Sequence, residues 1–403
     1  MKVLHVVAQM DPRFGGVGQA IRTITDGLQL LNVYSEVVCL DSPNADFLSK
    51  EKMLVHAVGP GSGPWQYSKK LSPWLNLNLT RFDAVIVHGL WLYNGYATYK
   101  TISSLRKESL KKHDKNVPRF YVMPHGMLDP YFQIAKGRKL KALRNWLFWQ
   151  IVENKIVNHS DGLLFTCLVE QQLARQPFRP YHPKKEIVVG LGVDEPPVFM
   201  PCFETAFYSI CPQVAGQTYF LFLGRIHQKK GIDLLIKAYY KVREQYIAMP
   251  KLVIAGPGLE TAYGQHLHAL VKQKRLEDEV FFTGMLNGQS KWGALYGCEA
   301  FVLPSHQENF GIAVVEALAC GKPVLISNQV NIWQEIKNSD AGFIAEDTCE
   351  GTIKIFNRWL KSSVDQKIEM RKKARLCFEN YFAVKPVVSN ILKELVTNNQ
   401  SFY

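Results

Sequence analysis

Short apolar runs alternate with longer helical patterns along most of this chain, and this alternation constrains the fold more than any other feature. Such an order of elements is typical of βαβ units with parallel sheets. The expected strands of the first half are residues 3–7, 36–40, 84–88, 120–123, 162–166 and 186–189. Those of the second half are residues 219–223, 252–255, 280–283, 300–303 and 323–326. Two such sets predict an α/β protein with two doubly wound sheets.

The two sets of strands are separated by residues 190–217, which are rich in Gly and Pro and show no sustained periodicity. A segment of this kind is typical of a linker. We expect a first domain over residues 1–195, a second over residues 196–385, and a C-terminal helix at about residues 386–403 that packs back on the first domain. Because open α/β sheets bind ligands outside the carboxyl ends of their strands, the site is expected in the loops there, in a cleft between two facing sheets.

The composition is that of a globular protein with a cationic surplus. Hydrophobic residues make up 47% of the 403 residues, and 48 Lys and Arg against 35 Asp and Glu give a formal net charge of +13. The chain start does not resemble a signal peptide, and no apolar run approaches the roughly 18–20 residues of a membrane span. The eight cysteines form no Cys-x-x-Cys pair, so we expect a cytoplasmic protein without a disulfide scaffold or zinc site. The charge predicts an anionic partner without distinguishing nucleic acid, a membrane surface and a phosphorylated small molecule.

Residues 301–324 are the most informative stretch of the sequence. They predict a strand, a polar loop, a helix that ends at Gly321 and a further strand that begins at Pro323. Glu308 lies just before this helix and Glu316 on its second turn, so their backbones are at most roughly 12 Å apart. This separation suits the two ends of a nucleotide sugar. By themselves, two glutamates at this spacing are more simply a loop acid and a solvated helix residue.

The residues between these glutamates suit a diphosphate. The amides of Asn309, Phe310 and Gly311 are expected to point out of the N-terminus of the helix, where the partial positive charge favours an anion. A carboxylate beside a diphosphate makes sense where it accepts hydrogen bonds from hydroxyls, which sugars and riboses carry.

A second loop contributes two cations. After the expected strand 219–223 come Gly224 and Arg225 and, five residues later, Lys230 followed by Gly231. Arg225 and Lys230 can converge on one diphosphate and neutralise a leaving group. The alternative is that they are surface charges, and Lys229 is interpreted as merely solvated.

Glu308 and Glu316, separated by seven residues and followed by the pattern Ala-x-Ala-x-Gly-x-Pro-Val over 317–324, resemble the signature of the retaining family-four (group 1) glycosyltransferases. The similarity extends to bacterial members that build surface polysaccharide and exopolysaccharide. The resemblance implies the GT-B fold, in which two facing Rossmann-like domains, N-terminal for the acceptor and C-terminal for the nucleotide sugar, enclose a donor cleft. It implies that Glu308 binds the donor sugar, Glu316 the ribose, and Arg225 and Lys230 the leaving diphosphate.

The resemblance adds further residues around the donor. Gly15 and Gly16, after the first strand, would let the backbone approach the donor phosphate and sugar, and His125 would face the same groups. Met285 and Leu286 would lie near the nucleotide base. His88 also follows a strand, but a structural role is the simpler interpretation for it.

The implied reaction moves a hexosyl group from a UDP-sugar or GDP-sugar to a hydroxyl of a glycan or lipid-linked acceptor, with retention and without a cofactor. The sequence has no Asp-x-Asp pair at the site to hold a metal. Arg225 and Lys230 would stabilise the leaving group in its place, which predicts a metal-independent transferase. No side chain is assigned as base, because the donor's phosphate oxygen can take the proton.

A basic segment over residues 136–149 leaves two interpretations open. It combines an apolar stripe at helical spacing with five cations: Lys136, Arg138, Lys139, Lys141 and Arg144. One interpretation is a core-facing helix with a solvated basic face. The other is docking on the anionic inner face of a membrane as a peripheral protein, with Trp146 or Trp149 at the interface.

Other function classes fit less well. A basic nucleotide- or nucleic-acid-binding protein without transferase activity is the main alternative, but the chain shows no nucleic-acid recognition motif, so no nucleic-acid partner is expected. A dehydrogenase would need the G-x-G-x-x-G fingerprint, which is missing after the first strand. The sequence leaves open the sugar, the nucleotide base, the acceptor and the oligomeric state.

Overall fold

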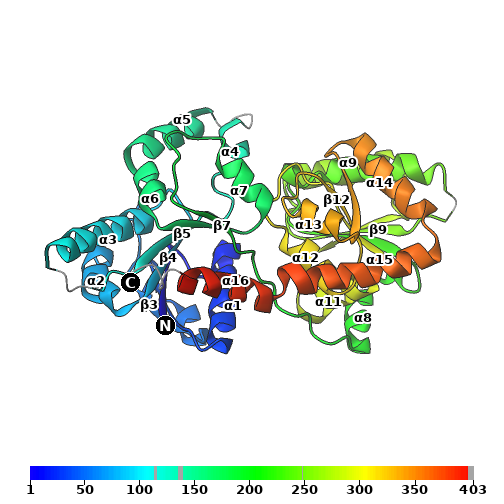
Figure 1. The fold of residues 1–403 in the computed structure, drawn as a ribbon. Coiled ribbons are helices and arrows are strands. Elements are labelled where there is room, and N and C mark those ends of the chain that lie inside the picture. Colours follow the sequence, from blue (N-terminus) through cyan, green and yellow to red (C-terminus); the bar gives the residue numbers. More distant parts are fainter. Residues whose placement is uncertain (113–115, 135–138, 247, 398–403) are drawn as a thin grey trace. The chain divides into compact units, whose positions relative to one another are not determined.

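The computed structural model describes residues 1–112, 116–134, 139–246 and 248–397 (Figure 1). The chain divides into two compact units, Met1–Gly192 together with Val384–Tyr403, and Val193–Ala383. Each unit contains one parallel β-sheet flanked by helices. The predicted α/β class with two doubly wound sheets is therefore confirmed.

The first unit is built on a sheet of seven strands in the order β3-β2-β1-β4-β5-β6-β7. The strands are β1 (Lys2–Val6), β2 (Tyr34–Cys39), β3 (Leu54–Ala57), β4 (Ala84–His88), β5 (Arg119–Met123), β6 (Gly162–Phe165) and β7 (Glu186–Val188). The helices are α1 (Gly16–Leu30), α2 (Leu71–Asn78), α3 (Tyr93–Lys112), α4 (Tyr131–Ile134), α5 (Lys139–Phe148), α6 (Asn154–His159), α7 (Leu168–Ala174) and α16 (Val384–Thr397), with a π-helical turn at Trp149–Glu153. The order reverses at β1, which pairs in parallel with both β2 and β4.

The second unit has a sheet of six strands in the order β10-β9-β8-β11-β12-β13. The strands are β8 (Tyr219–Leu223), β9 (Lys251–Ala255), β10 (Val280–Gly284), β11 (Ala300–Leu303), β12 (Val324–Ser327) and β13 (Gly342–Ala345). The helices are α8 (Pro201–Tyr208), α9 (Ile232–Arg243), α10 (Ala262–Gln273), α11 (Gly288–Gly297), α12 (Ile312–Ala319), α13 (Trp333–Asn338), α14 (Cys349–Lys361) and α15 (Val364–Cys377), followed by a π-helical turn at Phe378–Phe382. Here β8 and β11 are the central pair.

The last helix returns to the first unit, although the second unit separates it from that unit in sequence. Helix α16 packs against α1 (Figure 1). Gly27 of α1 permits this approach, because a Cβ at that position would collide with the side chains of Val384 and Val388. The apolar residues of α16 therefore complete the core of the first unit.

The structure corrects the expected linker and adds two strands. Residues 190–217 are not structureless, since they contain α8, which begins with Pro201 in its first turn and packs against α11 of the second unit. The additional strands β3 and β13 lie at sheet edges and have four residues each. Both are mostly half-buried.

Candidate functional site

Two loops meet at the carboxyl edge of the second sheet. Strands β8 and β11 pair in parallel, so the loops that follow them begin side by side. The carbonyl oxygen of Lys229, in the loop after β8, accepts hydrogen bonds from the Ser305 hydroxyl at 2.8 Å and the His306 amide at 2.7 Å, both in the loop after β11. These bonds hold the two loops together.

Gly231 makes this close approach possible. Its φ of +64° lies in the left-handed region, and a Cβ there would collide with the carbonyl oxygen of Pro304. A residue with a side chain would therefore meet both backbone strain and a steric clash. The Lys-Gly pattern recognised in the sequence thus has a local reason, which is to seat Lys230 beside the loop after β11.

Lys230 and Glu308 form an ion pair across the two loops, with side chains 21% and 20% exposed. The backbone of Glu308 is fixed on its other side, since its amide donates to the Gln329 carbonyl at 2.9 Å and its carbonyl accepts from the Asn331 amide at 3.0 Å. The structure therefore brings together a predicted cation and a predicted carboxylate, and it pairs them directly.

Glu316 has a partner that the sequence did not indicate. It lies on α12, and its carboxylate is 2.7 Å from the Nζ atom of Lys291 on α11. Lys291 follows β10 in a segment that carries no recognisable motif, so only the tertiary structure identifies it. The result is a second half-buried Lys–Glu pair, which joins α11 to the helix that follows Glu308.

The start of α12 differs from the expectation. The helix begins at Ile312, with Gly311 as its N-cap at a φ of +77°. Asn309 and Phe310 precede the helix, so the first amides of its N-terminus are those of Ile312 and Ala313 rather than theirs. Phe310 is buried, and its ring lies edge-on against that of Phe382, with centroids 5.7 Å apart. Its side chain therefore belongs to the core of the unit.

The other predicted residues of the second unit are placed by neighbouring loops. Arg225 is exposed and forms no ion pair with any described residue, while the next amide, that of Ile226, donates to the Pro257 carbonyl at 2.8 Å. Met285 is exposed and Leu286 is buried in the loop after β10. The guanidinium of Arg225 is thus available to an anion.

In the first unit, Gly15 and Gly16 lie between β1 and α1. Gly15 is the N-cap of α1 at a φ of +115°, and Gly16 is the first residue of the helix. Nothing lies within 4 Å of where a Cβ of Gly15 would be. The backbone at this N-terminus is therefore open to a ligand.

His125 lies in the loop after β5, where it and Gly126 both have positive φ values. The amide of Gly126 donates to the Glu170 carboxylate at 2.5 Å, which anchors this turn to α7. The Nε2 atom of His125 is 3.0 Å from Nδ1 of His88, so His88 directly contacts a predicted site residue. Burial lowers the pKa of His125 to about 4, which keeps its ring neutral at neutral pH.

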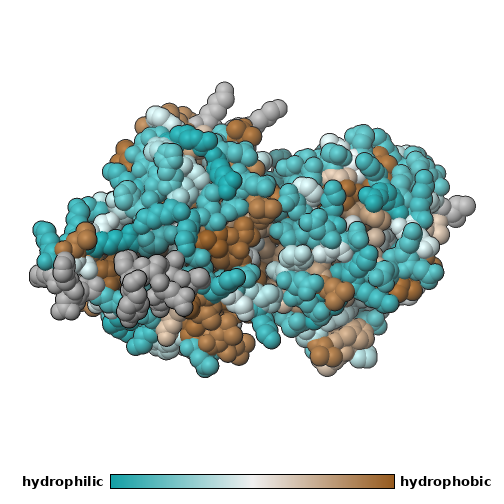
Figure 2. Space-filling model, viewed as in Figure 1, coloured by the Kyte–Doolittle hydropathy of each residue, from teal (hydrophilic) through white to brown (hydrophobic). Residues whose placement is uncertain are grey.

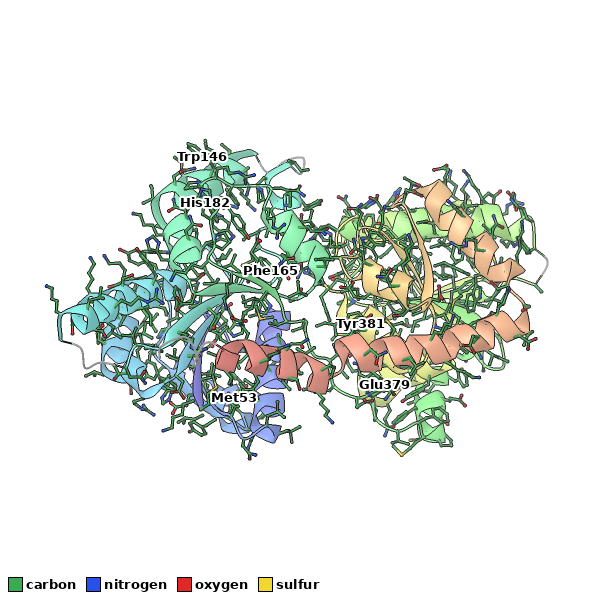
Figure 3. All side chains as sticks on the ribbon, viewed as in Figure 1. Met53, Trp146, Phe165, His182, Glu379 and Tyr381 are labelled. Atoms are coloured by element: carbon green, nitrogen blue, oxygen red, sulfur yellow. The ribbon has the colours of Figure 1, made fainter. Side chains whose placement is uncertain are left out.

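Four apolar side chains of the basic segment are exposed. Lys136 and Arg138 lie outside the described residues, as does the side chain of Lys139. On α5 the most exposed apolar side chains, between 47% and 86% accessible, are Leu140, Leu143, Trp146 and Leu147. Figure 2 shows hydrophobic surface at this helix, and Figure 3 shows Trp146 at the outer side of the unit.

These exposures decide in part between the two interpretations of the basic segment, a core-facing helix and a helix that docks on a membrane. The core-facing interpretation does not hold for Leu140, Leu143, Trp146 and Leu147, which face solvent, but it holds at the end of α5, where Phe148 packs against the core. Trp149 is fully buried and stacks on Phe178 with centroids 4.8 Å apart, so of the two tryptophans only Trp146 is available to an interface. Among the described residues, no helix has the length and apolarity needed to cross a bilayer.

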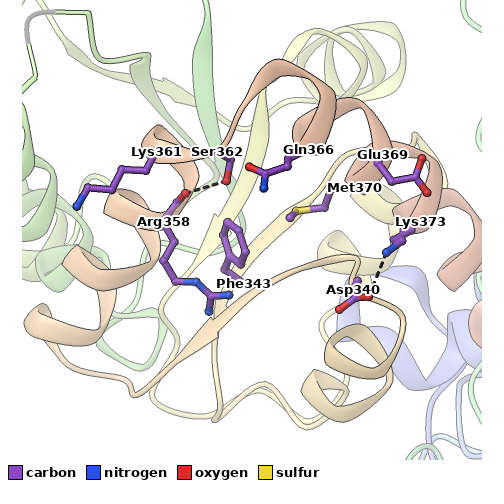
Figure 4. Close-up of a pocket in the computed structure, with 9 residues that line it drawn as sticks. All are labelled: Asp340, Phe343, Arg358, Lys361, Ser362, Gln366, Glu369, Met370 and Lys373. Carbon is purple, nitrogen blue, oxygen red and sulfur yellow. Dashed lines mark hydrogen bonds and ion pairs between the residues drawn. The ribbon is translucent and has the colours of Figure 1, made fainter.

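A separate pocket of about 520 Å³ lies in the second unit (Figure 4). It is lined by Asp340, Phe343, Arg358, Lys361, Ser362, Gln366, Glu369, Met370 and Lys373. Within it Lys373 pairs with Asp340 at 3.1 Å, and the Arg358 guanidinium lies 4.1 Å from the centre of the Phe343 ring. None of the predicted site residues lines it.

Comparison with known proteins identifies related sequences. A family model described as glycosyl transferases group 1 matches residues 212–376. Glycogen synthase of Mycobacterium tuberculosis is 30% identical over 366 residues, which cover 85% of this chain and 81% of that protein. O-antigen chain mannosyltransferase C of Escherichia coli is 22% identical over 357 residues, covering 84% and 82%. Other relatives are matched over less than half their length, among them an uncharacterized glycosyltransferase of Methanocaldococcus jannaschii.

A solved structure shows the same fold. The crystal structure of Anabaena Alr3699/HepE in complex with UDP superposes with a TM-score of 0.73 at 16% identity, covering 98% of this chain and 100% of that chain. The likeness extends over both units.

Proposed function

The chain belongs to the group 1 glycosyl transferases and has their GT-B fold, and from this membership we propose that it transfers a sugar from a nucleoside-diphosphate donor to an acceptor hydroxyl with retention of configuration. The product belongs to polysaccharide or glycolipid biosynthesis. The contact between Lys230 and Glu308 carries the proposal.

A bound nucleotide sugar can replace each partner of this ion pair. A diphosphate competes for the Lys230 ammonium, and sugar hydroxyls donate to the Glu308 carboxylate, so each partner gains a new polar contact as the ion pair separates. Arg225, exposed and without an ion pair among the described residues, adds a second cation for the same diphosphate. Glu316 on α12 and Lys291 on α11 form the second ion pair, and we propose that the ribose binds there.

The proposed reaction breaks the bond between the anomeric carbon and the diphosphate and forms one to the acceptor oxygen. The acceptor's proton passes to an oxygen of the leaving phosphate on the same face of the sugar. Charge develops on the diphosphate as it leaves, and Arg225 and Lys230 stabilise it electrostatically. We propose that these two cations replace a metal ion and that no cofactor is needed.

A panel of nucleotide sugars tests the proposal. A donor at 100 times its dissociation constant is expected to stabilise the protein by roughly 2.7 kcal/mol, because it binds only the folded state. UDP-glucose, UDP-N-acetylglucosamine and GDP-mannose are compared by thermal unfolding, since relatives include a UDP complex and a mannosyltransferase. Absence of a shift with every donor, together with no release of UDP or GDP, would contradict the proposal.

We also propose that α5 docks on an anionic lipid surface, which would bring the enzyme to a lipid-linked acceptor. The exposed cations Lys141 and Arg144 accompany the exposed apolar residues of this helix. Each cation near an anionic surface contributes about 1 kcal/mol, and Trp146 has the amphipathic ring that favours the interface.

Sedimentation with liposomes tests this docking. At low salt the protein is expected to sediment with phosphatidylglycerol vesicles and much less with phosphatidylcholine vesicles. The double variant Leu143→Ser with Trp146→Ser is expected to lose most of this binding. Leu77→Ser is the matched control, because Leu77 is an exposed leucine on α2. Equal sedimentation with neutral and anionic vesicles would rule the docking out.

A further inference from the structure

Three histidines form one continuous hydrogen-bonded row in the first unit. His5 lies on β1, His88 ends β4, and His125 follows β5, and these strands are neighbours in the sheet. Nδ1 of His5 is 2.9 Å from Nε2 of His88, and Nδ1 of His88 is 3.0 Å from Nε2 of His125. We call these three residues the histidine row.

The two ends of the histidine row differ. Nε2 of His5 is buried and has no hydrogen-bond partner in the described part of the chain. The side chain of His125 is partly exposed, and its Nδ1 atom is not hydrogen-bonded to a described residue. The row therefore begins at a closed end inside the core and ends at the carboxyl edge of the sheet.

The rings are neutral at neutral pH. Burial lowers the pKa of His5 to about 4 and that of His125 to about 4, and burial together with its two neighbours lowers the pKa of His88 well below 6.5. Three neutral rings carry three N–H protons, and each of the two hydrogen bonds uses one. The third proton must lie at one end, either on Nε2 of His5 or on Nδ1 of His125.

Burial decides between these two ends. An N–H on Nε2 of His5 would be a buried donor without an acceptor, which is rarer in proteins than an unused acceptor lone pair. On His125 the same proton can reach solvent or a ligand. We propose that the histidine row is polarised outward, so that His5 and His88 act as positioning residues that make His125 present a fixed Nδ1–H donor.

The use that we assign to the Nδ1–H group of His125 rests on the proposed function. An Nδ1–H group can donate to an oxygen of the donor sugar or its phosphate, and it cannot accept a proton. The ring stays neutral, so it orients the substrate by a directed hydrogen bond rather than by charge. The contact with Nδ1 of His88 thereby fixes which ring nitrogen of His125 carries the proton.

Nitrogen-15 NMR of the full chain with labelled histidine tests the polarity without any assay of activity. Long-range proton–nitrogen correlation distinguishes protonated from unprotonated ring nitrogens, and His125→Phe assigns the signals of that ring. At pH 7, His125 is expected to be protonated at Nδ1 and unprotonated at Nε2. The reverse pattern, with the proton on Nε2, would overturn the proposal even if sugar transfer is observed.

Substitution of His88 tests the positioning role. His88→Leu removes the donor to Nε2 of His125, so His125 is expected to show a mixture of tautomers, and the rate of sugar transfer should fall several-fold. His88→Asn keeps an amide donor and is expected to restore the single tautomer and the rate, while His159→Leu, a change at an exposed histidine of α6, should alter neither. An unchanged His125 tautomer in His88→Leu would overturn the role. If sugar transfer is absent from the unchanged protein, only the proposed function fails, because the NMR pattern stands independently.

Discussion

Replacing Lys230 with methionine is expected to lower the rate of sugar transfer by about 10²–10³-fold, the usual loss when one group that stabilises a developing negative charge is removed. Methionine keeps the length of the aliphatic chain and removes the charge. The loss should be mainly in kcat, since the charge on the diphosphate is greatest as the leaving group departs. The measurement is release of UDP or GDP from the donor identified in the panel.

Lys229→Met is the matched control. Lys229 is the neighbouring residue and carries the same charge, but its ammonium hydrogen-bonds to the Gln307 side chain at 3.2 Å instead of meeting Glu308. The Lys229→Met variant should retain activity close to that of the unchanged protein. Equal losses in both variants would show that overall charge, and not the position of Lys230, is responsible.

Glu308→Ala completes the test of this site. Removal of the carboxylate is expected to abolish measurable hydrolysis and transfer, because the sugar loses its acceptor group and Lys230 loses its partner. The effects of Lys230→Met and Glu308→Ala should not add when combined, since the two side chains are in direct contact. An unchanged rate of donor hydrolysis in Glu308→Ala would refute the site.

Glu153→Gln is expected to stabilise the protein at alkaline pH and to leave it nearly unchanged near pH 4.5. Glu153 is buried, its Oε1 atom accepts from the Trp91 amide at 2.8 Å, and its Oε2 atom has no hydrogen-bond partner among the described residues. Burial raises the pKa of this carboxyl from 4.5 to about 8. Between these values the folded state holds a proton that the unfolded state has lost, so stability falls as the pH rises.

Glutamine removes this titration and keeps an acceptor for the Trp91 amide. The free energy of unfolding of the variant should exceed that of the unchanged protein by an amount on the order of several kcal/mol at pH 8.5. Urea unfolding at pH 5 and pH 8.5 measures the difference. Asp26→Asn, at a half-exposed carboxylate of α1, is the control. A stability difference between Glu153→Gln and the unchanged protein that does not vary with pH would contradict the prediction.

Local patterns predicted most strands of both sheets. The inner strands and the loops carrying Lys230 and Glu308 follow from short stretches of sequence, because alternation, turn glycines and motif spacing act over a few residues. The sequence expectation omits β3 and β13, two four-residue strands at the sheet edges. Helix α8 was missed because the Gly and Pro residues around it are typical of a linker.

Contacts between distant segments could not be predicted in this way. Lys291 and Glu316 are 25 residues apart, and His5 and His88 are 83 residues apart. No local pattern predicts that β1, β4 and β5 are adjacent, which is why the sequence favours a structural role for His88 and does not reveal its contact with His125. The exposure of the four apolar side chains on α5 also depends on which surface the rest of the unit covers.

By itself, the sequence determined the α/β class, the two sheets, the family and the residues of the loops that carry the proposed chemistry. These follow from hydrophobic periodicity and from glycines and charges at fixed spacing, which are properties of neighbouring residues. Only the tertiary structure decided that Lys230 pairs with Glu308, that three histidines form a row, and that Trp146 is exposed while Trp149 is buried. Such features depend on strand order and side-chain packing, which bring together residues that no local pattern connects.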